Sequence, residues 1–229
     1  MVPAPLPFLC PSRMPAFDTA LAVLDWLGLA VFAVTGALVA SRKQMDIVGF
    51  ALLGTATGIG GGTLCDLILD VPVFWAAEPA YLATCLAVSL LVFFTAHIPQ
   101  SRYTLLLWFD AAGLALFAVA GAEKALGVGA DPLVAVFLGV ATATFGGILR
   151  DVIGGEPSIA LRREIYVTAA VLAAGVFVGL AAAGAPREVA IGAGLAAGFG
   201  LRGAALAFGW SLPRYRPRPG RSPDEIGKG

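Results

Sequence analysis

Long apolar runs separated by short polar gaps dominate the chain of 229 residues. Seven of these runs predict helices, at positions 20–40, 47–69, 81–96, 105–122, 132–153, 165–183 and 189–210. A helix needs about 20 residues to cross a hydrocarbon core, and most of the runs are close to that length. The third run is short, and the preceding residues 76–80 are candidates to extend it. The pattern predicts an all-α membrane protein with seven transmembrane helices.

An internal duplication divides the apolar region into units. Shifted by 85 positions, residues 25–81 align with residues 110–166 without a gap, with 22 identities in 57 positions. The matches include Asp25 with Asp110, Asp66 with Asp151, and Tyr81 with Tyr166, which shared apolar composition would not align at one offset. We expect a first three-helix repeat at 20–104, a second at 105–186 and a seventh helix at 187–212. Residues 1–19 and 213–229, which are rich in proline, are expected to be a flexible N-terminal tail and a basic, disordered C-terminal tail.

The odd number of helices in each repeat makes the second copy cross the membrane in the opposite direction, as an inverted three-plus-three repeat. Charges in the gaps agree with this arrangement and give it an orientation. One side holds three basic residues, Arg13, Lys124 and Arg187. The other side holds ten, namely Arg42, Lys43, Arg102, Arg162, Arg163, Arg214, Arg216, Arg218, Arg221 and Lys228. The positive-inside rule predicts an outside N-terminus and a cytoplasmic C-terminus.

Composition excludes several classes of function. Apolar residues make up 59% and charged residues 13% of the chain, and the mean hydropathy is +0.87, which argues against a soluble enzyme and a disordered chain. A net charge of zero gives no support for nucleic-acid binding. Three cysteines without C-x-x-C spacing and a single histidine offer neither a disulfide framework nor a zinc site. We therefore expect no catalytic residues, no cofactor and no metal beyond a permeant ion.

Glycine-rich stretches occur at equivalent points of the second and fifth predicted helices. The first contains Thr57, Gly60, Gly61 and Gly62, and the second contains Thr142, Gly146 and Gly147. Glycine clusters locate kinks or breaks in helices, and a break within a membrane is tolerated where it is buried or lines a water-filled cavity. Two breaks in an inverted repeat predict an ion or substrate pathway, with Thr57 and Thr142 beside it. The alternative is close helix packing through small residues.

Ionisable residues follow each glycine stretch. Asp66 and Asp151 occupy equivalent positions, and Arg150 precedes the second, whereas Cys65 takes its place in the first. Ionisable groups inside a membrane helix are costly unless they are paired or hydrated, so all three charged residues are candidates for the pathway. Neighbours on a helix point about 100° apart, so we expect Arg150 to pair across helices, with Asp66 as a candidate partner. The alternative is an ion pair that only holds the two halves together.

Four further residues are paired by the repeat. Asp25 and Asp110 are expected to cap the first and fourth helices, and the alternative is that they lie at the pore mouths. Tyr81 and Tyr166 follow the glycine helices, and either anchor the protein at the membrane interface or contribute to gating.

These motifs resemble the prokaryotic trimeric intracellular cation (TRIC) channel family, some members of which are catalogued as glycine transporters. The resemblance rests on residues 60–66 and 146–151, on the opening Asp25-x-x-Gly28-x-x-x-Phe32-Ala33, and on the seventh helix. It implies a homotrimer with a pore inside each protomer, lined by kinked second and fifth helices. The implied activity is conduction of monovalent cations, K⁺ or Na⁺, in a prokaryotic cell membrane, with lipid as a partner. In the family the motif leads into an Arg-Asp pair in both copies, and Cys65 departs from that pattern.

Two functions would use the glycine stretches and the charged residues after them in different ways. In a channel, carbonyls freed at the breaks and the carboxylates of Asp66 and Asp151 would replace part of a cation's hydration, with Arg150 as a charge barrier. In a secondary transporter, half-helix N-termini would hold the carboxylate of a small zwitterion such as glycine. A purely structural membrane protein would leave the repeated glycine stretches unexplained.

Overall fold

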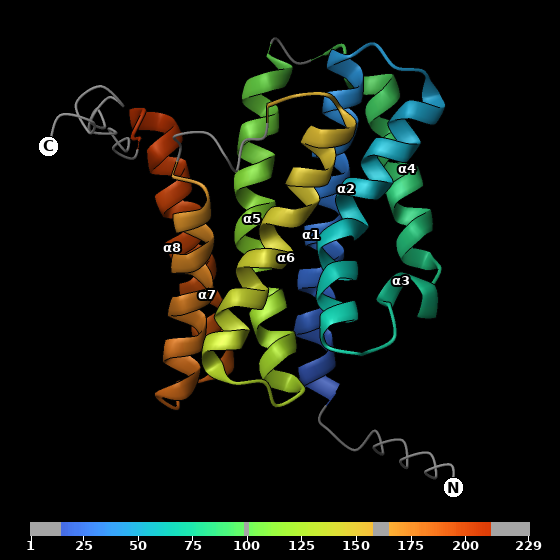
Figure 1. Cartoon of the computed structure of the whole chain (residues 1–229). Coiled ribbons are helices and arrows are strands. Elements are labelled where there is room, and N and C mark those ends of the chain that lie inside the picture. The colour runs from blue at the N-terminus through green and yellow to red at the C-terminus, as the bar shows by residue number, and fades with distance from the viewer. Residues whose placement is uncertain (1–14, 99–100, 158–164, 212–229) are drawn as a thin grey trace, which may run out of the picture.

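The computed structural model describes residues 15–98, 101–157 and 165–211. These residues form a bundle of helices standing side by side (Figure 1). The elements are α1 (Pro15–Arg42), α2 (Ile47–Ile68), α3 (Phe74–Ala77), α4 (Ala80–Thr95), α5 (Arg102–Gly127), α6 (Pro132–Ile153), α7 (Val167–Ala182) and α8 (Arg187–Phe208).

Side-chain caps and glycine turns fix several helix ends. Asp46 accepts a hydrogen bond from the Gly49 amide at the start of α2, and Asp131 accepts one from the Leu133 amide at the start of α6, both at 2.8 Å. These caps satisfy amide groups that have no partner in the first turn of a helix. Gly129, with a φ of 86°, makes the turn after α5, a conformation that other residues rarely adopt.

Most of the predicted helices agree closely with the observed ones. Five helices are long and apolar enough to cross a membrane, and two further apolar helices, α4 and α7, have 16 residues each. Three boundaries differ from the prediction. Residues 15–19, expected in a tail, begin α1; α5 continues past position 122 to Gly127; and α3 is a separate short helix rather than an extension of α4. The rest of both predicted tails lies outside the described residues.

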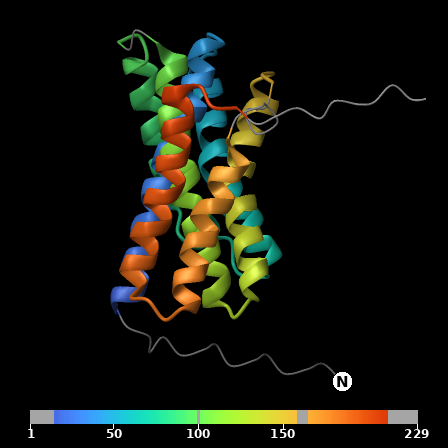
Figure 2. The ribbon, with the colours of Figure 1, turned by 90° about the vertical axis from the view of Figure 1, so that its left-hand side faces the viewer.

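Corresponding helices of the two halves run in opposite directions. In Figure 1, α1 rises, α2 descends and α4 rises, whereas α5 descends, α6 rises and α7 descends. The final helix, α8, rises beside α7 and ends at the opposite end of the bundle from the start of α1 (Figure 2). The same view shows α7 and α8 side by side at the front of the bundle, where they pack on each other and on α5, and α7 also packs on α6.

The prediction that the second and fifth helices are broken is wrong for the described structure. Both α2 and α6 are uninterrupted α-helices across their glycine stretches. A methyl group on Gly61 would collide with the Thr142 carbonyl oxygen, and one on Gly146 would lie 2.6 Å from the Thr57 carbonyl oxygen. The glycines therefore allow α2 and α6 to cross at close range, which is the small-residue packing considered as the alternative.

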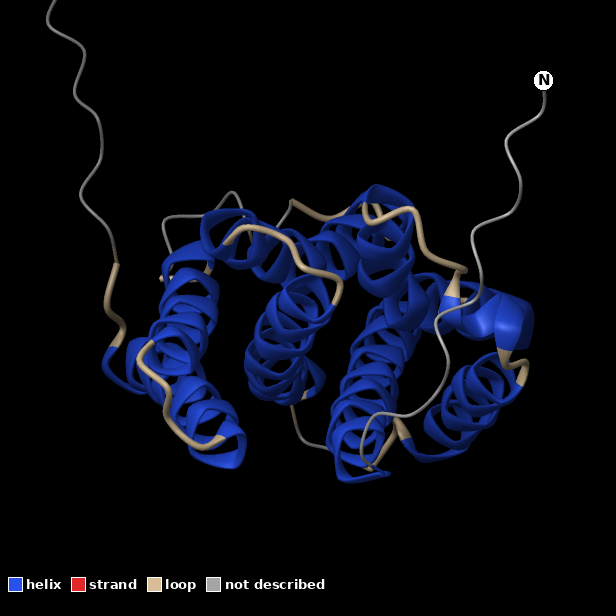
Figure 3. Cartoon of the chain, turned by 90° about the horizontal axis from the view of Figure 1, so that it is seen from below, coloured by secondary structure: helices blue, strands red, loops and turns tan. Residues whose placement is uncertain are grey.

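The outside of the bundle is strongly apolar. Large hydrophobic side chains remain exposed on several helices, including Leu52, Leu91, Phe94, Leu133, Phe137 and Val152. Seen from below, the helices pack side by side as a bundle joined by loops (Figure 3), and α1, α2 and α4 are in mutual contact, as are α5, α6 and α7. Exposed apolar surface on this scale is expected where lipid replaces water as the solvent. The protein is an all-α membrane protein.

Candidate ion pathway

The crossing of α2 and α6 lies at the centre of the inverted repeat. Each crossing glycine packs on the backbone of a threonine in the other helix: Gly61 of α2 meets Thr142 of α6, and Gly146 of α6 meets Thr57 of α2. Both threonine hydroxyls donate to the carbonyl oxygen four residues earlier in their own helix, at 2.6 Å for Thr57 and 2.7 Å for Thr142. The predicted threonine and glycine residues therefore come together as a symmetric contact at the middle of the bundle.

A fully buried ion cluster follows this crossing in the second half. The Arg150 side chain has no exposed surface, and it donates from Nη1 to Asp110 Oδ1 at 2.6 Å and from Nε to Asp151 Oδ1 at 2.9 Å. The Tyr166 hydroxyl lies 3.5 Å from the same Asp110 oxygen, and the Arg202 guanidinium stacks over the Tyr166 ring. These groups converge at Gly147, where an added methyl would meet Tyr166 and the cluster side chains. The guanidinium fills the space between α5 and α6.

Two expectations about this cluster are wrong. Arg150 does not pair with Asp66; it pairs with Asp110 across helices and also with its neighbour Asp151. The flexible Arg150 side chain overcomes the 100° separation of adjacent positions by bending back along its own helix. Asp110 does not cap a helix either, because α5 begins eight residues earlier and Ser101 is its cap.

The first half holds a different cation. The buried Asp66 carboxylate pairs through Oδ1 with the Lys124 ammonium, which comes from α5 of the second repeat. Its other oxygen, Oδ2, accepts a hydrogen bond of 2.9 Å from the Phe74 amide and so fixes the start of α3. Cys65 is buried beside it, at the position that Arg150 holds in the other half. Lys124 thus supplies from another helix the positive charge that Cys65 lacks.

A small, partly open cavity lies beside the Lys124–Asp66 pair. Its volume is ≈ 20 Å³, which is room for about one water molecule. It is lined by Asp25, Gly62, Cys65, Phe74, Phe117, Ala120, Gly121, Lys124 and Thr142. Asp25 lies within α1, not at its start, so it does not cap that helix, and it lines the cavity together with Lys124. The first half therefore has a cavity where the second half has a guanidinium.

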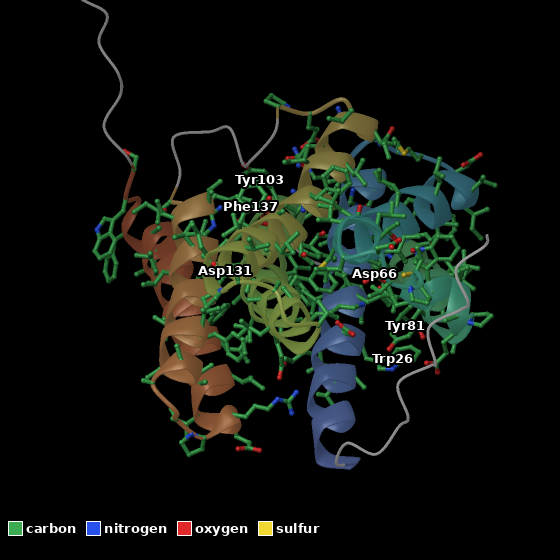
Figure 4. The ribbon with its side chains drawn as sticks, turned by 60° about the horizontal axis from the view of Figure 1, so that its bottom comes forward. Trp26, Asp66, Tyr81, Tyr103, Asp131 and Phe137 are labelled. Atoms are coloured by element: carbon green, nitrogen blue, oxygen red, sulfur yellow. The ribbon has the colours of Figure 1, made fainter. Side chains whose placement is uncertain are left out.

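Both repeated tyrosines are buried inside the bundle. Tyr81 is 7% exposed and Tyr166 is 1% exposed, so neither side chain faces the surroundings as an interfacial anchor would. Tyr81 stacks on Trp26 with ring centres 4.2 Å apart, and it meets Phe74 edge-on at 4.9 Å. Figure 4 shows Trp26 and Tyr81 next to each other, on the same side of the bundle as Asp66. Phe74 also lines the cavity, so this aromatic group adjoins the first-half cluster.

Sequence reasoning missed Lys124 as a member of the site because the predicted fourth helix ended at position 122. The sequence does indicate a longer helix: Gly127 and Gly129 mark its end after position 122, and Asp131 caps the next helix. Extending the helix to Gly127 adds almost one and a half turns and brings Glu123 and Lys124 inside the bundle. Glu123 pairs there with Arg187 at the start of α8.

These features define a polytopic α-helical membrane protein whose interior carries fixed charges on both sides of a central helix crossing. Within the described residues, no group of three or more His, Cys, Asp or Glu side chains could hold a metal ion. A sequence-family model described as Glycine transporter matches residues 22–97 and again residues 107–182, so its two matches are 85 positions apart. This is the offset of the internal alignment.

Known proteins resemble the chain over most of its length. The inner membrane protein YadS of Escherichia coli is 42% identical over 151 residues, which is 65% of this chain and 73% of YadS. A membrane protein of Vibrio cholerae is 38% identical over 210 residues, covering 90% of this chain and 87% of that protein. The solved TRIC trimeric intracellular cation channel orthologue from Rhodobacter sphaeroides is 63% identical, with a TM-score of 0.82 over 84% of this chain and all of that one.

A second solved structure, from a description of conductance through TRIC cation channels, is 32% identical. Its TM-score is 0.77 over 87% of this chain and 98% of that one. The chain belongs to the TRIC channel family. The family is one of ion channels, so the protein is not an enzyme.

Proposed function

We propose that the protein is a monovalent cation channel, permeable to K⁺, with one pathway inside each protomer of a homotrimer. The observation that carries this proposal is the 63% identity over the whole length of a solved chain described as a trimeric intracellular cation channel. The charged interior supports it, because ionisable groups within membrane helices mark ion or substrate pathways.

Side chains, rather than freed backbone carbonyls, would replace the hydration of the ion. The helices α2 and α6 are uninterrupted, so their carbonyls remain engaged within the helices. Asp25 and Asp66 supply the negative charge on one side of the crossing, and Asp110 and Asp151 supply it on the other. In this arrangement the pathway is closed, because Arg150 fills one half and Lys124 occupies the other. Conduction requires both cations to move aside.

The protein is proposed to lie in the inner membrane of a prokaryote, as the name of its relative YadS states for that protein. Arg42 at the end of α1, Lys43 just after it and Arg102 at the start of α5 lie at one end of the bundle. This basic end would face the cytoplasm, and the N-terminus would lie outside.

Transport of a small zwitterion such as glycine is the second candidate, because the matching family model is described as Glycine transporter. A transporter of this kind would hold a carboxylate at the N-termini of broken helices. The glycine stretches of α2 and α6 offer no such free N-termini, so the geometry favours the channel.

Flux measurements on proteoliposomes separate the two candidates. Vesicles containing the purified protein should take up Tl⁺, a K⁺ analogue, down its gradient without any glycine present. The matched assay uses radiolabelled glycine in the same vesicles. Saturable glycine uptake without Tl⁺ flux would overturn the proposal in favour of the transporter.

A further inference from the structure

The last helix, α8, lies outside the internal repeat and brings a charge of its own into the bundle. Its Arg202 is six residues before the end of the helix at Phe208, and it is only 1% exposed. A long basic side chain near the end of a membrane helix usually extends to the interface, whereas this one is buried. A buried charge within a membrane helix is costly unless it is balanced, so Arg202 points to a function beyond packing.

Small residues of α8 bring Arg202 to the charged cluster of the second half. A methyl group on Gly198 would lie 2.6 Å from an alanine side chain of α7, and one on Gly203 would lie 3.2 Å from the Trp108 ring of α5. These close approaches seat α8 against both helices. The Arg202 guanidinium then lies 5.3 Å from the centre of the Tyr166 ring, where a cation is attracted by the electrons of the ring.

Tyr166 connects Arg202 to the buried ion cluster. The Tyr166 hydroxyl donates to Asp110 Oδ1 at 3.5 Å, and the same oxygen accepts from Arg150 at 2.6 Å. Asp151 is the second carboxylate that bonds to Arg150. Two carboxylates and one guanidinium have a formal charge of −1, and Arg202 brings the formal charge of the second half to zero.

The first half has a different balance. Its repeated tyrosine, Tyr81, stacks on Trp26 with ring centres 4.2 Å apart, so a neutral aromatic ring takes the place of the guanidinium. The carboxylates of Asp25 and Asp66 and the ammonium of Lys124 sum to a formal charge of −1. The two halves of the interior therefore differ by one formal charge, and α8 is the source of the difference.

We propose that Arg202 sets the charge of the second half of the pathway and thereby the height of its barrier to cations. It acts from α8 as a fixed charge held against Tyr166, whereas Arg150 is the cation that must move aside. A positive charge in a low-dielectric interior repels a permeant cation strongly, so Arg202 makes the second half the less favourable one for the ion. The proposal deepens the proposed function and rests on it.

The unitary K⁺ conductance of assembled channels tests the charge of Arg202. Arg202→Gln should raise it about twofold or more, in dilute and in concentrated KCl alike, because salt screens a buried charge only weakly. Arg202→Lys keeps the charge and should conduct like the unaltered protein. Lys43→Gln removes an exposed lysine and is the matched control, with an effect confined to dilute KCl. An unchanged or lower conductance in Arg202→Gln, or an equal rise in Arg202→Lys, overturns the proposal.

Charge compensation provides a second variant. Arg202→Gln combined with Asp110→Asn restores a formal charge of zero and should return the conductance to that of the unaltered protein. If Arg202→Gln alone does not assemble, a double variant that assembles supports the proposal, because removing a carboxylate would not rescue a packing role. A double variant that also fails to assemble overturns it.

Thermal unfolding in detergent measures the same coupling without conduction. Arg202→Gln and Asp110→Asn should each lower the Tm, because each leaves an unbalanced buried charge, and the double variant should lose less than the sum of the two. Additive losses overturn the proposal. A protein that shows the coupling but no K⁺ current in planar bilayers keeps the charge balance and loses the proposed function. A protein that conducts but shows additive losses keeps the channel and loses the role of Arg202.

Discussion

The interior cations, Arg150 and Lys124, differ in how firmly they are held. Arg150 is fully buried between two carboxylates, whereas the Lys124 side chain bonds to one carboxylate and remains 25% exposed. Removing Arg150 leaves two buried anions without a cation, and removing Lys124 leaves a smaller imbalance beside a cavity. The first substitution should therefore cost more stability than the second.

Replacing Arg150 should destabilise the fold. We expect Arg150→Ala to lower the free energy of unfolding by about 3–5 kcal/mol, the usual cost of leaving buried charges unpaired. Unfolding in detergent by heat or denaturant measures the change. Adding Asp110→Asn and Asp151→Asn in the same background should recover much of the loss. Unchanged stability of Arg150→Ala would show that the cluster is hydrated and contributes little.

Arg150 and Asp66 should act independently, because each has its own partner. The combined effect of Arg150→Ala and Asp66→Asn on stability should equal the sum of the single effects within about 0.5 kcal/mol. A double-mutant cycle measures this. A coupling larger than that would restore the direct contact between the two residues that the sequence suggested.

Replacing Lys124 should increase cation conduction. Lys124→Gln removes a positive charge from the pathway, so the unitary K⁺ conductance should rise at low salt and approach that of the unaltered protein at high salt. Lys43→Gln, which removes an exposed lysine at the other end of the bundle, is the matched control. A conductance that falls, or that rises equally in both variants, would place Lys124 outside the pathway.

At the scale of the helices, the apolar pattern predicted where each helix begins and ends better than it predicted which side chains meet between helices. It gave both ends of α6 and the start of α2 correctly, because apolar length and the caps at Asp46 and Asp131 act locally. It could not show that Arg150 meets Asp110, because this depends on how α5 and α6 are rotated about their axes. The glycine stretches were ambiguous for a similar reason. The same residues allow either a break or a close crossing, and only the neighbouring helix decides between them.

The close crossing predicts different outcomes for two kinds of glycine. Gly61→Ala should destabilise the protein by about 1–3 kcal/mol, because the new methyl collides with the backbone of α6. Gly192→Ala in α8, where nothing lies within 4 Å of the new methyl, should be neutral or stabilising by up to about 1 kcal/mol. Detergent unfolding of both variants tests the crossing. Equal effects would mean that α2 and α6 are not in close contact at Gly61.

At the scale of the whole molecule, the inverted arrangement gives two chemically different ends. The connections after α1 and α4, with their basic residues, lie at one end, and the turns between α5 and α6 and between α7 and α8 lie at the other (Figure 1). The two halves are alike in fold yet unlike in charge. In the first half Cys65 stands at the position of Arg150, and Lys124 supplies the buried positive charge that Arg150 supplies in the second half.

A topology reporter tests the orientation. An alkaline phosphatase fused after Gly229 should be inactive in a prokaryotic host, and a green fluorescent protein at the same place should fluoresce, because the basic end remains in the cytoplasm. The opposite pair of results would reverse the orientation and require a different number of membrane crossings.

Single-channel recording of covalently linked trimers tests the central claim, a cation pathway inside each protomer, most directly. The linked unaltered trimer in a planar bilayer should show unitary K⁺ currents that reverse near the K⁺ equilibrium potential. With Cys65→Arg and Lys124→Val in one protomer only, about two-thirds of the conductance should remain, since a second buried guanidinium adds a barrier to that protomer's pathway and leaves the other two pathways unchanged. Complete loss of current would mean one pathway shared by the trimer, and absence of unitary steps in the unaltered trimer would mean that the protein is not a channel.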